Sequence, residues 1–284
     1  MAHTPAQLDE VVANVVALYE DAERVALGRI ARALERGADS PAWVEEKLLE
    51  VQGVLSRVRR DLRDLDVRTE SAVLSAITAA YQKGAGPAAG GVLAAVRGPS
   101  GRPRLSAAAL ALAAETASGL RAGHAQILRS VGDVWREVVA KASGVQLTGA
   151  ATRREAASEA LARLADRGLT MFVDRSGRRW QARSYVDMAM RTAAHQASEV
   201  GFTDRMADSG RDLVIVSDHK GECPDCRKFE GKVLSISGAY VPREGDPPVD
   251  VFASLAQAKA AGYGHPGCRH RLVAFVPGVT EVPE

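Results

Sequence analysis

The residues best suited to bind a metal or to act as nucleophiles gather in the last quarter of the sequence. All three cysteines lie there, two in the C-x-x-C motif at 223–226 and one in the stretch GHPGCRH at 264–270. Zinc prefers four thiolate or imidazole ligands in a tetrahedron, and one tight turn can supply two of them. The spacing therefore predicts a Cys3His zinc site built from Cys223, Cys226, His265 and Cys268. His219 and His270 are reserve ligands or outer neighbours of that site.

A second interpretation needs no metal. Reduced cysteines and a polar histidine turn can pack and hydrogen-bond where neighbouring strands meet. The sequence leaves this packing interpretation open beside the zinc site.

Enzymatic chemistry has weaker support in the same residues. Zinc nucleobase deaminases need H-x-E and P-C-x-x-C, but Glu222 precedes this C-x-x-C and no histidine is followed two residues later by glutamate. A thioredoxin-like redox site needs the C-x-x-C at a helix start, whereas this one is expected in a loop. A metal-dependent nuclease with Asp218 and His219 at a strand end, or another zinc enzyme, stays open as the alternative.

Composition indicates a folded, water-soluble chain. The 284 residues are 46% apolar and 25% charged, with a net charge of +2. That balance supports a sizeable core, and overall charge identifies no partner. No stretch of 18 apolar residues and no basic leader is present, so we expect a protein made in a reducing cytoplasm and no contact with a membrane.

The first half is expected to be helical. Residues 8–34 carry an apolar face that Gly37 ends, and residues 40–83 carry a second apolar stripe, with Ser40 as N-cap and Pro41 as first helical residue. The stripe of the second helix is formed by Val44, Leu48, Val51, Leu55, Val58, Leu62 and Leu65. An antiparallel hairpin within the chain would bury both faces, and a partner protein is the alternative. Residues 1–83 are therefore interpreted as a helical hairpin arm.

A Gly- and Pro-rich linker or loop is expected at 84–105. Helical pattern resumes over 106–168, with Gly144 and Gly168 as stops. His124 within it is interpreted as a structural or solvent-facing histidine and not as a ligand.

The last segment, 169–284, reads as an α+β domain. It contains a hairpin at 169–180 with its turn near Asp174 and Gly177, a helix at 182–209, a short helix near 254–261, and strands at 213–217, 233–236 and 271–276. Pairing of these strands would bring the two cysteine motifs together. The expected class is thus α+β, with long N-terminal helices and a small antiparallel sheet closed by a Cys/His knot.

An ordered set of residues over about 165–278 resembles the C-terminal region of tailed-phage minor capsid (minor head) proteins, of the Mu F-type group and the related minor capsid protein 2 family. The matching positions are Gly177, Trp180, Tyr185, Arg191, Thr192, His219, Cys226, Gly231, Pro266, Cys268, Arg269 and His270. Cys223 is not part of the family pattern, so its place in the zinc site comes from spacing alone.

The resemblance implies a structural head protein and not an enzyme. It implies a protein that enters the procapsid with the portal protein, contacts the major capsid or scaffold protein, and lies inside the virion near the portal vertex and packaged DNA. The basic residues at 153–154 and 175–179 are either phosphate contacts or solvated surface.

Overall fold

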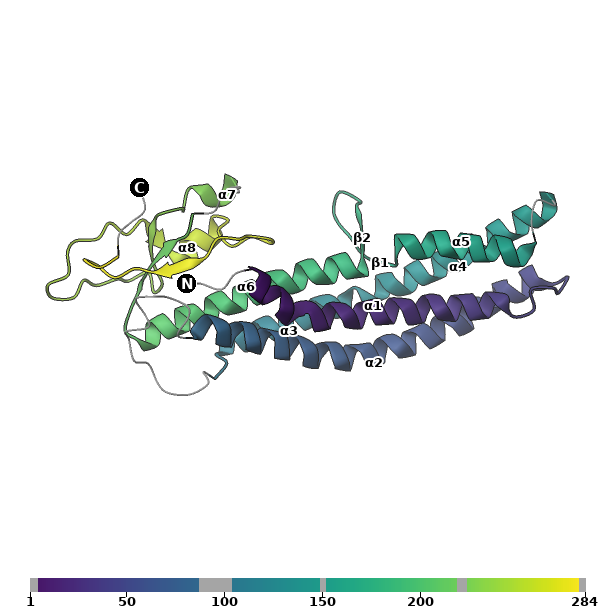
Figure 1. Cartoon of the computed structure of the whole chain (residues 1–284), viewed down its shortest axis with the longest axis horizontal. Coiled ribbons are helices and arrows are strands. Elements are labelled where there is room, and N and C mark those ends of the chain that lie inside the picture. Colours follow the sequence, from purple (N-terminus) through teal and green to yellow (C-terminus); the bar gives the residue numbers. More distant parts are fainter. Residues whose placement is uncertain (1–4, 87–103, 149–151, 219–223, 281–284) are drawn as a thin grey trace. The chain divides into compact units, whose positions relative to one another are not determined.

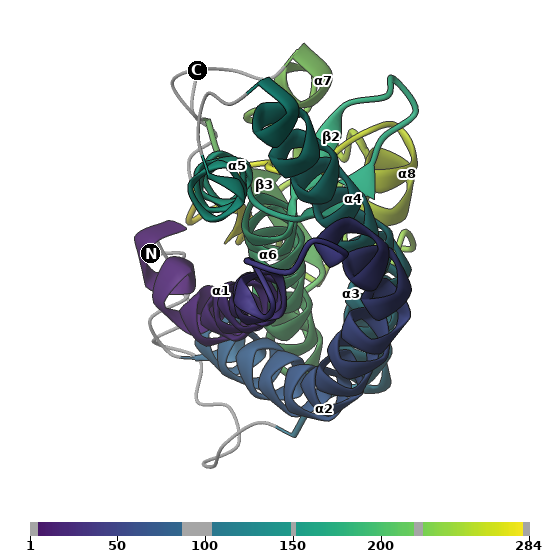
Figure 2. The same ribbon diagram turned by 90° about the vertical axis from the view of Figure 1, so that its right-hand side faces the viewer.

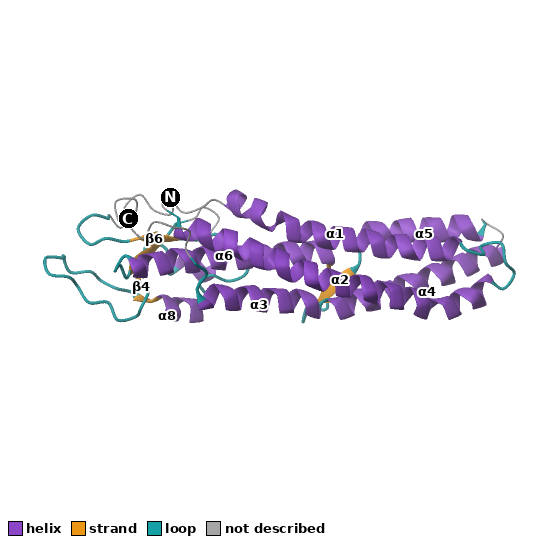
Figure 3. Ribbon diagram, turned by 90° about the horizontal axis from the view of Figure 1, so that it is seen from below, coloured by secondary structure: helices purple, strands orange, loops and turns teal. Residues whose placement is uncertain are grey.

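The computed structural model describes residues 5–86, 104–148, 152–218 and 224–280 (Figure 1). They fall into two compact units: unit 1 takes residues 1–13, 73–116 and 188–284, and unit 2 takes residues 14–72 and 117–187. Helix dominates the described chain and the strands are short (Figure 3), so the expected α+β class is confirmed.

Eight helices and six strands are present in the described ranges. The helices are α1 (Pro5–Glu35), α2 (Trp43–Ala85), α3 (Ala107–Ala122), α4 (His124–Thr148), α5 (Arg153–Arg167), α6 (Ala182–Asp208), α7 (Pro224–Arg227) and α8 (Leu255–Ala260). The strands are β1 (Thr170–Val173), β2 (Arg179–Gln181), β3 (Leu213–Val216), β4 (Val233–Ser235), β5 (Ala253–Ser254) and β6 (Leu272–Ala274). Among the helices so described, none is long and apolar enough to cross a membrane.

In unit 2, α1 and α2 form the expected antiparallel hairpin (Figure 2). The Lys47 ammonium donates to the carbonyl of Ala33 at 2.6 Å, and the guanidinium of Arg29 donates to Asp61 at 2.7 Å, so pairs near and far from the turn are both in register. Gly37 has φ of 65° in that turn, which a residue with a side chain rarely adopts.

The buried face of α2 differs from the expected stripe at its start. The C-terminal part of the stripe is buried as expected, at Val58, Leu62 and Leu65. Leu48, however, is 55% exposed, while Trp43 and Lys47 are buried. An apolar repeat of 3.5 residues drifts by about 20° per heptad on a helix of 3.6 residues per turn, so a stripe correct at one end rotates out at the other. The buried face of α1 is also shifted by one residue at this point, because Val25 is exposed and Ala26 is buried.

Two of the expected helix boundaries need correction. Gly144 does not stop α4, which continues to Thr148, because one glycine inside a helix costs only about 1 kcal/mol. α2 begins at Trp43, after the expected cap Ser40, whose hydroxyl accepts a hydrogen bond from a backbone N–H in the intervening turn. Gly168 does follow the end of α5, with φ of 68°.

The hairpin expected after Gly168 is present as β1 and β2, which pair antiparallel. In the same unit, β1 packs on α4, where the backbone N–H of Thr170 donates to the Ser130 hydroxyl at 3.1 Å.

In unit 1, the ends of α2 and α6 touch at backbone level. A Cβ atom at Gly84 would lie 1.8 Å from the carbonyl oxygen of Ser198, and one at Gly201 would lie 2.1 Å from that of Tyr81. The Tyr81 hydroxyl donates to Asp204 at 2.9 Å beside this crossing. Burial, followed by the contact with Asp204, raises the pKa of Tyr81 to about 12.

A four-stranded sheet in the order β5-β4-β3-β6 forms the centre of the C-terminal region. β3 pairs antiparallel with β4 and with β6, as expected from the sequence, while β5 adds a parallel edge that was not expected. All four residues of β3 are buried because the sheet is covered on both faces. One face packs against Phe202 and Met206 of α6 and Leu255 of α8, and the other is covered by the loop residues Tyr240, Val249 and Val251.

Most of the expected linker at 84–105 lies outside the described residues, since 87–103 are not described. The division into segments at 1–83, 84–105, 106–168 and 169–284 stays a prediction.

Candidate metal centre

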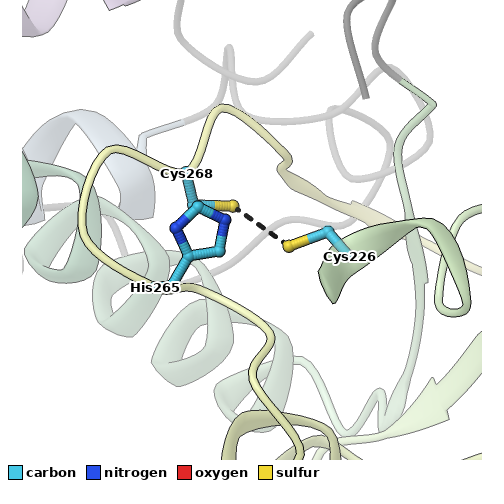
Figure 4. Close-up of side chains that lie close together, drawn as sticks. All are labelled: Cys226, His265 and Cys268. Carbon is cyan, nitrogen blue, oxygen red and sulfur yellow. Dashed lines mark hydrogen bonds between the residues drawn. The ribbon is translucent and has the colours of Figure 1, made fainter. Parts of the chain in front are cut away.

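β3 brings two distant loops to one place in unit 1. Cys226 follows β3 and lies in the single turn α7, and His265 and Cys268 lie in the loop between α8 and β6. Because β6 pairs with β3, that loop returns to the edge where α7 begins. Figure 4 shows the three side chains directed toward one another from these two segments.

The distances between the three side chains fit a tetrahedral metal site. Their potential ligand atoms all lie within 4.8 Å of one another. The sulfurs of Cys226 and Cys268 are 3.7 Å apart and no disulfide joins them. Two sulfurs bound to one zinc at about 2.3 Å stand about 3.8 Å apart at tetrahedral corners, whereas a disulfide would bring them to about 2.05 Å. The pair therefore has the spacing of two ligands on one ion.

The imidazole of His265 is oriented to use its Nε2 atom as a ligand. Nδ1 lies 2.9 Å from the carbonyl oxygen of Pro266, which can only accept, so Nδ1 carries the proton. Nε2 is buried and has no hydrogen-bond partner in the described part of the chain. A buried nitrogen lone pair without a donor is costly unless a cation or a hydrogen-bond donor occupies its direction.

Around this cluster, which we call the Cys/His cluster (Cys226, His265 and Cys268), His270 forms the next layer of contacts. Its Nδ1 atom lies 3.6 Å from the Cys268 sulfur, and its Nε2 atom is hydrogen-bonded to Glu230. Its backbone carbonyl accepts from Nε2 of His195 on α6 at 2.9 Å. One residue thus connects a cluster sulfur, an acidic side chain and the long helix of unit 1.

Two of the residues expected at the site cannot be placed. Cys223, the fourth predicted zinc ligand, and His219, the reserve ligand, lie outside the described residues. His270, the other reserve residue, contacts the Cys268 sulfur. The structure therefore brings together three of the four predicted ligands, and the assignment of zinc remains a prediction.

Sequence reasoning did not identify Glu230 or Tyr263 as parts of this region. Tyr263 is 3% exposed and packs in the same core as Cys226. Burial, followed by the nearby Glu199 and the two thiols, raises the pKa of Tyr263 well above its usual value. Its phenol therefore stays neutral beside the sulfurs. Neither residue belongs to a spaced motif, so the sequence carried no signal for them.

Arg191 and His195, four residues apart on α6, have separate roles. Arg191 forms an ion pair with Asp9, whereas His195 is hydrogen-bonded to the carbonyl of His270, two residues before β6. Both line a cavity of about 420 Å³ within unit 1, together with His265, Cys268, Arg269 and Arg271. The Cys/His cluster is consequently open to this cavity on one side.

These features describe a mostly helical protein with a small α+β region that carries a Cys/His cluster. The chain belongs to the phage minor capsid protein 2 family, whose model matches residues 3–284. The match covers nearly the whole sequence, beyond the region of 165–278 on which the resemblance was based. No curated protein and no solved structure matches the chain. Family membership makes the protein a structural component of the phage head that interacts with other head components.

Proposed function

We propose that the protein is a minor structural component of the procapsid and of the mature virion, located inside the capsid at the portal vertex. It assembles in the host cytoplasm with the portal protein and with the major capsid or scaffold protein, and it contacts packaged DNA and no membrane. The match to the family over residues 3–284 is the observation that carries this proposal.

Exposed apolar side chains on the helical hairpin supply a surface for a head partner. Leu49 of α2 is 83% exposed, Leu48 is 55% exposed and Val67 is 72% exposed. Exposed leucine and valine side chains are available to be buried on assembly, and each CH2 group buried contributes about 0.8 kcal/mol. The portal or coat protein is the proposed occupant.

Co-expression with the portal protein tests this assignment. Leu48→Glu with Leu49→Glu should abolish co-purification with the portal and incorporation into procapsids, while circular dichroism stays unchanged. Leu110→Glu on α3, where the leucine is 49% exposed, is the matched control and should assemble normally. Normal incorporation of the double variant would show that this part of α2 is not the docking surface.

For the Cys/His cluster we propose a structural zinc ion held by Cys223, Cys226, His265 and Cys268. The 3.7 Å separation of two sulfurs and the orphaned Nε2 atom of His265 support it. When bound, zinc would supply a cross-link between two loops. The chain's own contribution is orientation, because the Pro266 carbonyl holds the His265 ring and His270 holds the Cys268 sulfur.

The cavity beside His265 and Cys268 favours one alternative, a metal-dependent nuclease or another zinc enzyme. A catalytic metal keeps a position open to substrate, and a cavity is where substrate would enter. The test is cleavage of duplex DNA with added Mg²⁺, Mn²⁺ or Zn²⁺, comparing the wild type with His219→Ala. We expect no cleavage; metal-dependent cleavage lost in His219→Ala would replace the structural proposal for this cluster.

A further inference from the structure

The β1–β2 hairpin of unit 2 presents three guanidinium groups that have no acidic partner among the described residues. Arg175, Arg178 and Arg179 are exposed, and none forms an ion pair with any residue in the described ranges. Elsewhere in the same unit arginines are commonly paired, as in Arg29 with Asp61. The hairpin is therefore a site of uncompensated positive charge.

The carboxylate nearest to these arginines in the chain, Asp174, is fully used inside the turn. Its Oδ1 atom accepts from the backbone N–H of Ser176 at 2.9 Å, from the Ser176 hydroxyl at 2.6 Å and from the backbone N–H of Arg178 at 3.0 Å. Its Oδ2 atom accepts from the indole N–H of Trp180 at 3.2 Å. Four hydrogen bonds from three residues make the turn rigid, and they hold both carboxylate oxygens on these donors instead of on the guanidinium groups.

Aromatic side chains hold the hairpin in place on its helices. Phe172 of β1 stacks on Tyr185 at the start of α6, with ring centroids 4.9 Å apart and planes inclined by 23°. The guanidinium of Arg178 lies 4.5 Å above the ring of Trp180, which fixes one cation of the set. Within unit 2 the loop between β1 and β2 projects from the helices (Figure 1). The three arginines therefore lie on a rigid loop that projects from the helices of unit 2.

We propose that this hairpin binds the phosphate backbone of duplex DNA. Guanidinium groups are planar donors that match phosphate oxygens, and a two-stranded β-ribbon has the width to enter the major groove. The single carboxylate of the turn, Asp174, is outnumbered by the three guanidinium groups. The hairpin would be the surface that makes the DNA contact of the proposed function. Only the identification of that DNA as packaged phage DNA rests on the proposed function.

The number of phosphate contacts determines how steeply the binding constant falls with salt concentration. Each contact contributes about −0.9 to the slope of log K against log salt concentration, so three contacts contribute roughly −2.7. Removing them is expected to weaken binding roughly 100-fold or more at 0.1 M salt. The contacts carry no base information, so two unrelated DNA sequences should bind alike.

Fluorescence anisotropy with the full-length protein and labelled 20-base-pair duplexes of two unrelated sequences tests the proposal. The triple variant Arg175→Gln, Arg178→Gln, Arg179→Gln should lose affinity and flatten the salt slope by about 2 to 3. The matched control changes three exposed arginines of α2 that also have no carboxylate partner among the described residues, Arg59→Gln, Arg60→Gln and Arg63→Gln. It removes the same charge and should keep the wild-type affinity and slope.

Three results would overturn the proposal: no binding by the wild type, an equal loss in both triple variants, or displacement of DNA by poly-glutamate at equivalent charge. The third would identify an acidic protein surface as the partner. Incorporation of the hairpin variant into procapsids is measured separately. Normal incorporation with lost DNA binding supports the proposal, and absence of the wild type from procapsids would count against the head role instead.

Discussion

The Nε2 atom of His124 lies 3.1 Å from the hydroxyl oxygen of Tyr19, inside unit 2. The other ring nitrogen, Nδ1, lies 3.1 Å from Asp66, so the imidazole connects α1, α2 and α4. Nε2 is hydrogen-bonded to the Tyr19 hydroxyl, while the Asp66 carboxylate faces Nδ1. The histidine interpreted from sequence as structural or solvent-facing is buried and structural.

The stability of unit 2 should fall in mild acid because of His124. Burial lowers the pKa of His124 below its usual 6.5, Arg121 lowers it further, and Asp66 opposes both. The unfolded chain then takes up a proton near pH 6.5 and the folded chain only at lower pH. Stability is therefore fully present above pH 6.5 and declines as the pH falls toward the folded pKa, at up to about 1.4 kcal/mol per pH unit.

Urea unfolding between pH 7.5 and 5 measures this effect, with an NMR titration of the His124 ring as the direct check. His124→Gln should flatten the pH dependence. A ring that titrates at or above pH 6.5 in the folded protein would contradict the prediction.

Substitutions of the cluster cysteines should release zinc. Protein purified without chelator is expected to carry about one zinc per chain, measured by mass spectrometry of the metal, because the two sulfurs have the spacing of ligands on one ion and His265 lies within 4.8 Å of them. Cys226→Ser and Cys268→Ser should each lose it. A hundredfold excess of free zinc over its dissociation constant stabilises the fold by about 2.7 kcal/mol, so chelator should lower the melting temperature of the wild type only.

Cys223→Ser identifies the fourth ligand in the same assay. Loss of zinc in this variant places Cys223 in the site, and retention assigns the fourth position to another group. Well-folded wild type without zinc, insensitive to chelator, would favour packing of reduced cysteines.

Alanine at the α2–α6 crossing should destabilise unit 1. In Gly84→Ala and Gly201→Ala the added methyl group meets a backbone carbonyl that cannot rotate away, so the helices must separate. Overpacking of this kind costs about 1–3 kcal/mol. Gly119→Ala on α3, where no atom lies within 4 Å of the new methyl group, should instead stabilise the protein by about 0.5–1 kcal/mol through helix propensity. Equal midpoints of thermal unfolding for Gly201→Ala and Gly119→Ala would refute the close crossing.

The turn of the hairpin should persist to unusually acid conditions. Hydrogen bonds from Ser176, then Trp180, lower the pKa of Asp174 from 3.8 to about 2. A depressed carboxyl pKa stabilises the turn above the unfolded value of 3.8, and that contribution is lost as the pH falls through about 2. The carboxyl carbon chemical shift of Asp174 should titrate near pH 2, and Trp180→Phe should raise the midpoint; a midpoint near 3.8 in the wild type would mean that these bonds are absent in solution.

Much of the fold could be predicted because local pattern and final burial agree. The run Leu213–Val216 is apolar throughout, and it became the strand that is covered on both faces. Ser254 followed by Gln257 forms a capping box at the start of the expected short helix α8. In α2, by contrast, the exposure of Leu48 depends on how far a long helix rotates relative to its neighbours, and the repeat alone does not fix that.

The sequence predicted which residues could act as ligands in the candidate site. It did not predict the hydrogen bonds that surround them. Cysteine and histidine spacing pointed to Cys226, His265 and Cys268, which the structure brings together. The roles of Glu230 and His195 arise from tertiary contacts to the side chain and the carbonyl of His270, 40 and 75 residues away. A contact to a backbone carbonyl leaves no trace in residue type, so His195 could be placed on its helix but not assigned a partner.

The crossing of α2 and α6 also bears on the loop that carries the cluster. Where two backbones touch, neither helix can slide along or roll over the other without collision, whereas contacts through long side chains allow several rotamers. His195 lies six residues before Gly201 on α6, about 9 Å along the axis, and is hydrogen-bonded to the carbonyl of His270, two residues before β6. The close contact at Gly84 and Gly201 therefore fixes α6 against α2, and α6 in turn fixes the imidazole of His195. In this way two glycines position a loop that neither of them contacts.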